Sequence, residues 1–130
     1  MPQEPIRRGA VYWVTYAFPH ENAAVGGTEE GAEKQRPILI LQNDGDNQNV
    51  HYPLVQAAPI TTQKTDRVYE QDVLLPAGEA NLQQTSKVLL GLAQPFLKIR
   101  LGQRLGRVSP AKMREVAIKL LHLFGFAERR

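Results

Sequence analysis

Residues 34–44 constrain the fold of the chain more than any other segment, because a basic start, an unbroken apolar run and a polar end follow one another directly. The apolar run, residues 38–41, predicts a strand that is buried on both faces. Pro37 precedes this run, and its ring fixes φ and removes a backbone donor. Arg36 is therefore expected to project from a rigid mount at the start of the strand, which suits an anion-binding site.

The size of the chain indicates how many domains it forms. Its 130 residues, 42% of them hydrophobic, can bury one core and are too few for two ordinary domains. One domain covering residues 1–130 is therefore expected. The net charge of +3 comes from 16 Lys and Arg against 13 Asp and Glu, and basic residues are concentrated at 98–119. On charge alone, this bias favours a solvated basic face over a nucleic-acid footprint.

Residue types and apolar runs exclude several classes of protein. The chain has no cysteine, which excludes disulfides, thiolate nucleophiles and cysteine-ligated zinc. The first eight residues lack the apolar core of a signal peptide, and the longest apolar run is far too short to span a membrane. These features predict a soluble, cytoplasmic protein.

Short β-branched and apolar segments predict a mainly β fold. Strands are expected at residues 11–18, 38–41, 73–75 and 86–90, with an extended segment at 50–60 that Pro53 and Pro59 interrupt. Residues 86–90 are expected to form the last strand. Residues 45–47 predict a turn, and the long, polar, glycine-rich segment 19–35 predicts a loop of a kind that is usually functional or disordered.

The C-terminal segment gives the clearest helix prediction. Ser109 is a favourable N-cap, Pro110 suits the first helical position, and Gly125 can end the helix. The apolar stripe between them consists of Met113, Val116, Ala117, Leu120, Leu121 and Phe124. Several short strands followed by one terminal helix indicate a mainly β, α+β fold, a small and strongly bent antiparallel barrel with the helix packed against it.

A series of short motifs runs through nearly the whole chain: Arg8-Gly9-Ala10-Val11-Tyr12-Trp13-Val14, Gly27-Thr28-Glu29, Arg36-Pro37-Ile38-Leu39-Ile40-Leu41-Gln42-Asn43-Asp44, Ala58-Pro59-Ile60-Thr61, Val73-Leu74-Leu75-Pro76-Ala77-Gly78-Glu79, Leu101-Gly102 and Leu105-Gly106-Arg107-Val108-Ser109-Pro110. In this order they resemble the pattern of the MazF/PemK family, the toxin components of toxin–antitoxin pairs. The resemblance implies an SH3-like barrel of about five strands with a C-terminal helix, acting as a homodimer. It also implies metal-independent cleavage of single-stranded RNA at short sequences, with no cofactor, and an antitoxin peptide that blocks the RNA groove.

By this resemblance, Arg36 falls on the family's catalytic arginine, Thr61 on its catalytic Ser/Thr, and Thr28 with Glu29 on the Gly-Ser-Glu of its first loop. In RNA the 2′-hydroxyl can attack the neighbouring phosphate to give a 2′,3′-cyclic phosphate and a 5′-OH end, whereas DNA lacks that hydroxyl. A planar guanidinium can bind two nonbridging oxygens of the five-coordinate phosphorus while Thr61 donates a further hydrogen bond. Arg36 and Thr61 are therefore expected to stabilise the transition state.

The residue types do not decide which groups transfer protons. The pKa of arginine, roughly 12 or above, makes Arg36 a poor base, although it could protonate the leaving oxygen, and Glu29 is the more natural general base. Each candidate also has a structural explanation. Glu29 could be a solvated loop carboxylate, Arg36 could pair with a loop glutamate such as Glu33, and Thr61 and Thr62 could be strand-end hydroxyls that bond the backbone.

Five side chains are expected to contact RNA: Thr28, Gln42, Asn43, Thr62 and Gln94. Amides can make paired hydrogen bonds to base edges, so Gln42 and Asn43 are candidate base readers, although capping of the strand end is an equal alternative for both. Gln94 belongs to a departure from the family pattern, because Leu92-Ala93-Gln94 stands where many relatives carry Gln-x-Arg. The first loop is also several residues longer than usual.

Two other functions stay open, and one other catalytic mechanism is disfavoured. The same barrel occurs in toxins that poison DNA gyrase through contacts made largely by the terminal helix, and the aromatic and charged tip at residues 124–130 is compatible with that activity. The departures at Leu92 and Gln94 are compatible with a degenerate paralogue that binds RNA or an antitoxin but does not cleave. Histidine catalysis is disfavoured, because His20 has no evident partner.

Overall fold

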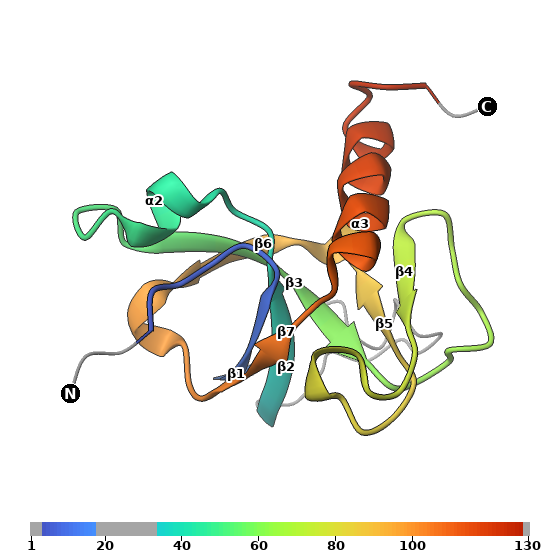
Figure 1. The fold of residues 1–130 in the computed structure, drawn as a ribbon, viewed down its shortest axis with the longest axis horizontal. Helices are drawn as coiled ribbons and strands as arrows, with labels where there is room; N and C mark the ends of the chain where they lie inside the picture. Colours follow the sequence, from blue (N-terminus) through green and yellow to red (C-terminus); the bar gives the residue numbers. More distant parts are fainter. Residues whose placement is uncertain (1–3, 18–33, 129–130) are drawn as a thin grey trace.

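The structure is a computed structural model that describes residues 4–17 and 34–128 (Figure 1). Within these residues, seven strands form one curled sheet in the order β4-β5-β3-β2-β1-β7, and β6 also pairs with β3. All of these pairings are antiparallel. The strands are β1 Ala10–Tyr16, β2 Lys34–Ile40, β3 Leu54–Thr61, β4 Asp72–Leu75, β5 Ser86–Leu89, β6 Gln94–Leu97 and β7 Arg104–Arg107.

The helices lie outside the sheet. They are α2 Asp44–Gln48, α3 Pro110–Leu123 and the 3-10 turns η1 Glu79–Asn81, η2 Leu90–Leu92 and η3 Lys98–Arg100. The C-terminal helix α3 contacts β4 and η2, and α2 lies well apart from it across the sheet (Figure 1). The predicted antiparallel, mainly β fold with a C-terminal helix is thus confirmed. Among the described residues, no helix has both the length and the apolar character that a membrane crossing requires.

Two hydrophobic clusters share the central strands and lie on opposite faces of β2. Leu39 belongs to the cluster that also contains Met113 and Val116 of α3, whereas Ile38 and Ile40 belong to the other. All three β2 residues are fully buried. Successive strand residues point to opposite faces, so β2 has apolar neighbours on both sides. The strand predicted from residues 38–41 is therefore confirmed, although it starts earlier, at Lys34, and ends at Ile40.

The terminal helix begins and ends as predicted. Ser109 caps it by accepting a hydrogen bond from the Lys112 amide at 3.3 Å, Pro110 occupies the first turn, and Gly125 follows with φ +78°. Met113 and Val116 are buried against the sheet. The far end of the predicted apolar stripe diverges from this pattern, since Leu121 and Phe124 are 46% and 65% exposed, whereas Leu120 is partly buried against the core.

The order of elements also shows where the sequence-based assignment is wrong. Residues 86–90 are not the last strand, because β6 and β7 follow. β6 contains Pro95 and β7 reads Arg-Leu-Gly-Arg, so neither has the β-branched run that marks a strand in a sequence. Pairing with β3 and β1, respectively, imposes the extended conformation.

The predicted turn at 45–47 is in fact the short helix α2. Asn43 is its N-cap and accepts a hydrogen bond from the Asp46 amide at 2.9 Å, which satisfies a donor of the first helical turn. The Asp44 carboxylate accepts a hydrogen bond from the Arg8 amide at 2.6 Å, and this bond lowers the pKa of Asp44. The polar end of the 34–44 segment therefore ties the exit of β2 to the start of β1.

A buried ion pair fixes the loop after β3 to the β4–β5 hairpin. Lys87 of β5 is fully buried, and its ammonium donates to the Arg67 carbonyl at 2.7 Å and lies 3.6 Å from the Asp72 carboxylate. Asp72 also accepts a hydrogen bond from the Tyr69 amide at 2.9 Å. Because Lys87 is the cross-strand partner of Thr61, this network holds the chain where it leaves β3.

Replacement of Asp72 by alanine should leave the buried ammonium of Lys87 without its anion. We expect the free energy of unfolding to fall by about 3–5 kcal/mol, as measured by urea denaturation. Asp66→Ala, which removes an exposed carboxylate from the same loop, is the matched control and should change stability by less than about 0.5 kcal/mol. Equal stabilities for the two variants would contradict a stabilising role for the pair.

Candidate active site

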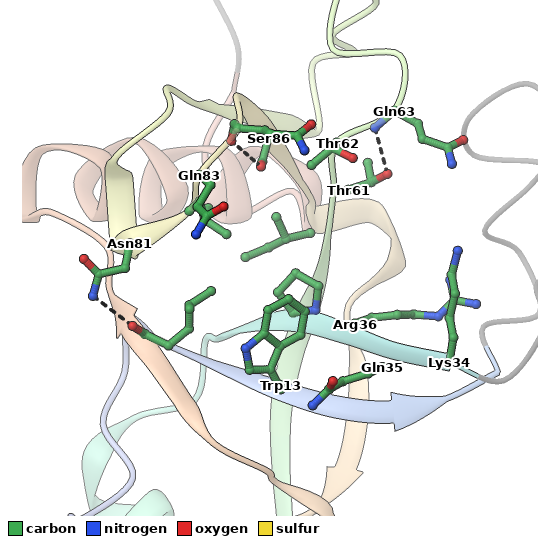
Figure 2. Close-up of a pocket in the computed structure, with 15 residues that line it drawn as sticks. Trp13, Lys34, Gln35, Arg36, Thr61, Thr62, Gln63, Asn81, Gln83 and Ser86 are labelled. Atoms are coloured by element: carbon green, nitrogen blue, oxygen red, sulfur yellow. Dashed lines mark hydrogen bonds between the residues drawn. The ribbon is translucent and has the colours of Figure 1, made fainter.

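A pocket of about 450 Å³ opens where β2 and β3 part (Figure 2). The two strands pair as far as Ile38 and Pro59, after which β3 continues against β5, with Thr61 opposite Lys87. The first residues of β2 are left paired with β1 alone. The pocket is the space between the separated strands, closed on its other sides by β7 and by the segment between η1 and β5.

Arg36 lies in the wall of this pocket on a firmly held part of β2. It pairs with Val14 of β1 and is 4% exposed. Its Nε donates to the Tyr16 carbonyl at 3.2 Å, and its guanidinium carbon lies 5.4 Å from the centroid of the Tyr16 ring. Continuing the β2–β3 register by two residues places Arg36 opposite Thr61. Strand pairing and the contacts with Tyr16 both restrict where this cation can point.

Thr61 ends β3 and also lines the pocket, together with Thr62. The Thr61 hydroxyl accepts a hydrogen bond from the Gln63 amide at 3.1 Å, drawn as a dashed line in Figure 2. This is the strand-end role that the sequence left as an alternative. A hydroxyl that accepts one bond keeps its own proton for donation, so the same side chain can still donate to a ligand. The structure therefore brings Arg36, Thr61 and Thr62 to one pocket.

Three of the other predicted RNA contacts, Gln42, Asn43 and Gln94, are not among the residues that line this pocket. Gln42 is buried, and its amide donates to the Leu54 carbonyl at 2.9 Å and accepts from the Gln56 amide at 3.2 Å. Asn43 caps α2, as described above. Both amides therefore fill the structural role that was the equal alternative for them, and a contact with RNA stays a prediction. Gln94 begins β6 and pairs with Ala57, whereas Thr28 and Glu29 lie outside the described residues.

Sequence analysis overlooked a set of uncharged polar and aromatic residues that line the same pocket. These residues are Trp13, Gln35, Gln63, Asn81, Gln83 and Gln84. Their only signal in the sequence is the cluster of amides at 81–84, directly after a glycine-containing turn. Lys34 and Arg36 are the only charged side chains among the described residues of the lining. One side of the pocket is thus cationic and the other neutral and rich in amides.

The neutral wall is carried by a backbone turn in an unfavourable conformation. Ala80 and Asn81 have φ angles of 53° and 62°, in the left-handed region that costs a residue with a Cβ roughly 1–2 kcal/mol. Several bonds hold the turn in place. Glu79 accepts from the Ser109 amide at 2.5 Å, and the Asn81 side chain donates to the Leu105 carbonyl at 2.9 Å. Strain that the surroundings enforce is typical of functional sites.

Comparison with known proteins identifies relatives of both sequence and fold. The family profile described as PemK-like, MazF-like toxin of type II toxin–antitoxin systems matches residues 7–124. Endoribonuclease MazF of Staphylococcus saprophyticus is 32% identical over 111 residues, which cover 85% of this chain and 84% of that protein. No group of three or more potential metal-ligating side chains occurs in the parts of the chain at 4–17 and 34–128.

Solved structures share the fold. A mycobacterial endoribonuclease in complex with its cognate antitoxin superposes with a TM-score of 0.72 and 23% identity, covering 95% of this chain and 99% of that one. The MazE–MazF complex of Deinococcus radiodurans gives a TM-score of 0.69 and 24% identity, covering 96% and 100%. At these identities the likeness supports the architecture, a curled antiparallel sheet with a C-terminal helix.

Gly106 of β7 should be essential to the strained turn. A Cβ added there would lie 2.5 Å from the Ala80 carbonyl oxygen, closer than such atoms approach, and backbone would have to move. We expect Gly106→Ala to lower the free energy of unfolding by about 1–3 kcal/mol in urea denaturation. Gly91→Ala, whose Cβ would have its nearest contact at an ordinary 3.8 Å, should be nearly neutral and serves as the control. Unchanged stability of the Gly106 variant would show that the turn is not tightly packed on β7.

Proposed function

The chain belongs to the PemK-like, MazF-like family of type II toxin–antitoxin toxins, and from this premise we propose that it is an endoribonuclease whose active site is the pocket of Arg36 and Thr61. The observation that carries the proposal is that these two side chains line the same pocket. They come from different strands and reach one pocket at the point where those strands part. The name of the staphylococcal relative supports the activity, and the pocket supports its location.

The arrangement suits cleavage of RNA by its own 2′-hydroxyl. In this reaction the 2′-oxygen bonds to phosphorus, the 5′-oxygen leaves, and the products are a 2′,3′-cyclic phosphate and a 5′-OH end. Negative charge builds up on the nonbridging oxygens, where a held guanidinium and a hydroxyl donor bind more strongly than in the ground state. Arg36 and Thr61 would fill these roles without a metal ion. On the family resemblance alone, we propose that Glu29 is the general base that takes the proton of the 2′-hydroxyl, and that the leaving 5′-oxygen takes up a proton from Arg36, which solvent then replaces.

Variants of these two residues test the proposal. Arg36→Ala should reduce the rate of cleavage of single-stranded RNA by roughly 10²–10³, measured with excess chelator, because one preorganised donor to the transition state is lost. Thr61→Val keeps the shape of the side chain and removes only the hydroxyl, so it tests the site even if loss of the buried guanidinium impairs folding. Arg100→Ala, in which an exposed cation of η3 is removed, should cleave at the wild-type rate.

The substrate and the products provide a second check on the same reaction. A substrate with 2′-deoxyribose at the scissile position should resist cleavage, and RNA fragments should carry cyclic phosphate ends. A requirement for a divalent ion, or full activity in both the Arg36 and Thr61 variants, would overturn the proposed mechanism.

One feature favours a different function. Phe124 and Phe126, at and beyond the end of α3, are 65% and 81% exposed. An exposed aromatic tip is compatible with a toxin that acts on DNA gyrase through protein contacts. Inhibition of gyrase by a protein that cleaves no RNA would establish this alternative, and RNA binding without cleavage and without gyrase inhibition would indicate a degenerate paralogue.

We also propose that the chain is one cytoplasmic domain, acts as a homodimer and is inhibited by a cognate antitoxin. Solved relatives in complex with their antitoxins support the last point. An acidic antitoxin segment would occupy the cationic side of the pocket in place of the RNA phosphates. Its Kd should rise with salt concentration, because ions screen exposed charges, and it should compete with RNA in a fluorescence binding assay. Salt-independent binding, or simultaneous binding of RNA and antitoxin, would contradict a shared site.

A further inference from the structure

The neutral wall of the pocket differs in chemistry from the catalytic side. Trp13 and Gln83 point toward the interior from opposite sides, whereas Lys34 and Arg36 lie next to each other on the other flank, with Thr61 on the same flank but apart from them (Figure 2). A phosphate would be drawn to the cations. A nucleobase, which is flat, uncharged and edged with donors and acceptors, matches an aromatic ring beside amides.

Gln83 is the amide best placed to bind a ligand. Its side chain is exposed, lines the pocket and makes no hydrogen bond to any residue at 4–17 or 34–128. The neighbouring Asn81 is already engaged with the Leu105 carbonyl, so it anchors the segment. Gln83 therefore has both its donor and its acceptor available to a base edge, on a backbone that the turn at Ala80 and Asn81 holds in place.

The volume of the pocket is sufficient for a nucleotide. About 450 Å³ lies within the range of roughly 300–1,000 Å³ typical of small-molecule sites. A nucleotide with its phosphate at Arg36 and its base toward Trp13 would occupy both sides of the pocket at once. The wall that binds the base would then decide which sequences are presented for cleavage.

We propose that Trp13 and Gln83 form a nucleobase subsite, in which one unpaired base next to the scissile phosphate stacks on the indole and is read by the Gln83 amide. Gln83 is in this view a specificity-determining residue that takes no part in bond breaking. The inference rests on the proposed function, since the base read is that of the RNA to be cleaved.

The experiment is cleavage of a randomised single-stranded RNA pool by the wild type, Gln83→Ala, Gln83→Glu and Gln103→Ala. Wild-type cleavage should favour one base at one position next to the cut. Gln83→Ala should reduce that preference roughly 10- to 100-fold while still cleaving the pool. Gln103→Ala removes an exposed amide that does not line this pocket, and it should retain the wild-type preference.

The Gln83→Glu variant tests the subsite more specifically, because it should change the preferred base and not merely weaken the preference. A carboxylate only accepts hydrogen bonds, so the preferred base should change toward guanine, whose Watson–Crick edge offers two neighbouring donors. Gln83 is exposed, and the thermal melting temperature of each variant should match the wild type. Unchanged base preference in both Gln83 variants would overturn the subsite, even if the wild type cleaves RNA as proposed.

A binding measurement separates failure of the subsite from failure of the proposed function. Trp13 is the only tryptophan in the chain, so its fluorescence reports directly on stacking. A randomised oligonucleotide with methylated 2′-hydroxyls, which cannot be cleaved, should quench this fluorescence and should be bound with the same base preference. Base-selective binding by a protein that does not cleave RNA would support the subsite and overturn the nuclease. Binding that leaves Trp13 fluorescence unchanged, or absence of any binding, would overturn the subsite.

Discussion

The register between β2 and β3 is the constraint on which the rest of the structure depends. It buries Ile38, Leu39 and Ile40 between two hydrophobic clusters, and a shift by one residue would turn each of them to the opposite face. The same register ends at Ile38 and Pro59, and the separation of the strands beyond this point creates the pocket. Core and candidate site are thus consequences of one strand pairing.

Much of this could be predicted from the sequence because its signals are local. The unbroken apolar run after Pro37 marks β2, and Ser109, Pro110 and Gly125 mark the ends of α3 through their own backbone preferences. Arg36 and Thr61 were recognised by resemblance, and their meeting in one pocket agrees with that prediction without testing their roles. β6 and β7 were missed because their extended conformation comes from partners distant in sequence.

The neutral side of the pocket could not be predicted for a related reason. An amide in a polar segment is ordinarily solvated, and only the fold shows that Gln83 faces Trp13, seventy residues earlier in the chain. Conversely, the sequence left base reading and capping of the strand end equally open for Gln42 and Asn43, and only the structure shows that their amides bond backbone groups around α2 and β3. Nothing in a linear sequence distinguishes an amide that closes a turn from one that is available to a ligand.

The pairing of Thr61 with the buried Lys87 has a consequence for how such a protein can diverge. Thr61, the proposed hydrogen-bond donor to the transition state, is paired across the sheet with the cation that anchors the adjacent hairpin, so a substitution at one position changes the free-energy cost of a substitution at the other. Related proteins could vary the amide wall readily, because its side chains are exposed, while the Thr61–Lys87 pair would be retained. If the amide wall reads a base as proposed, new target sequences would arise by exchange of these exposed residues while the strand pairing at Thr61 is kept.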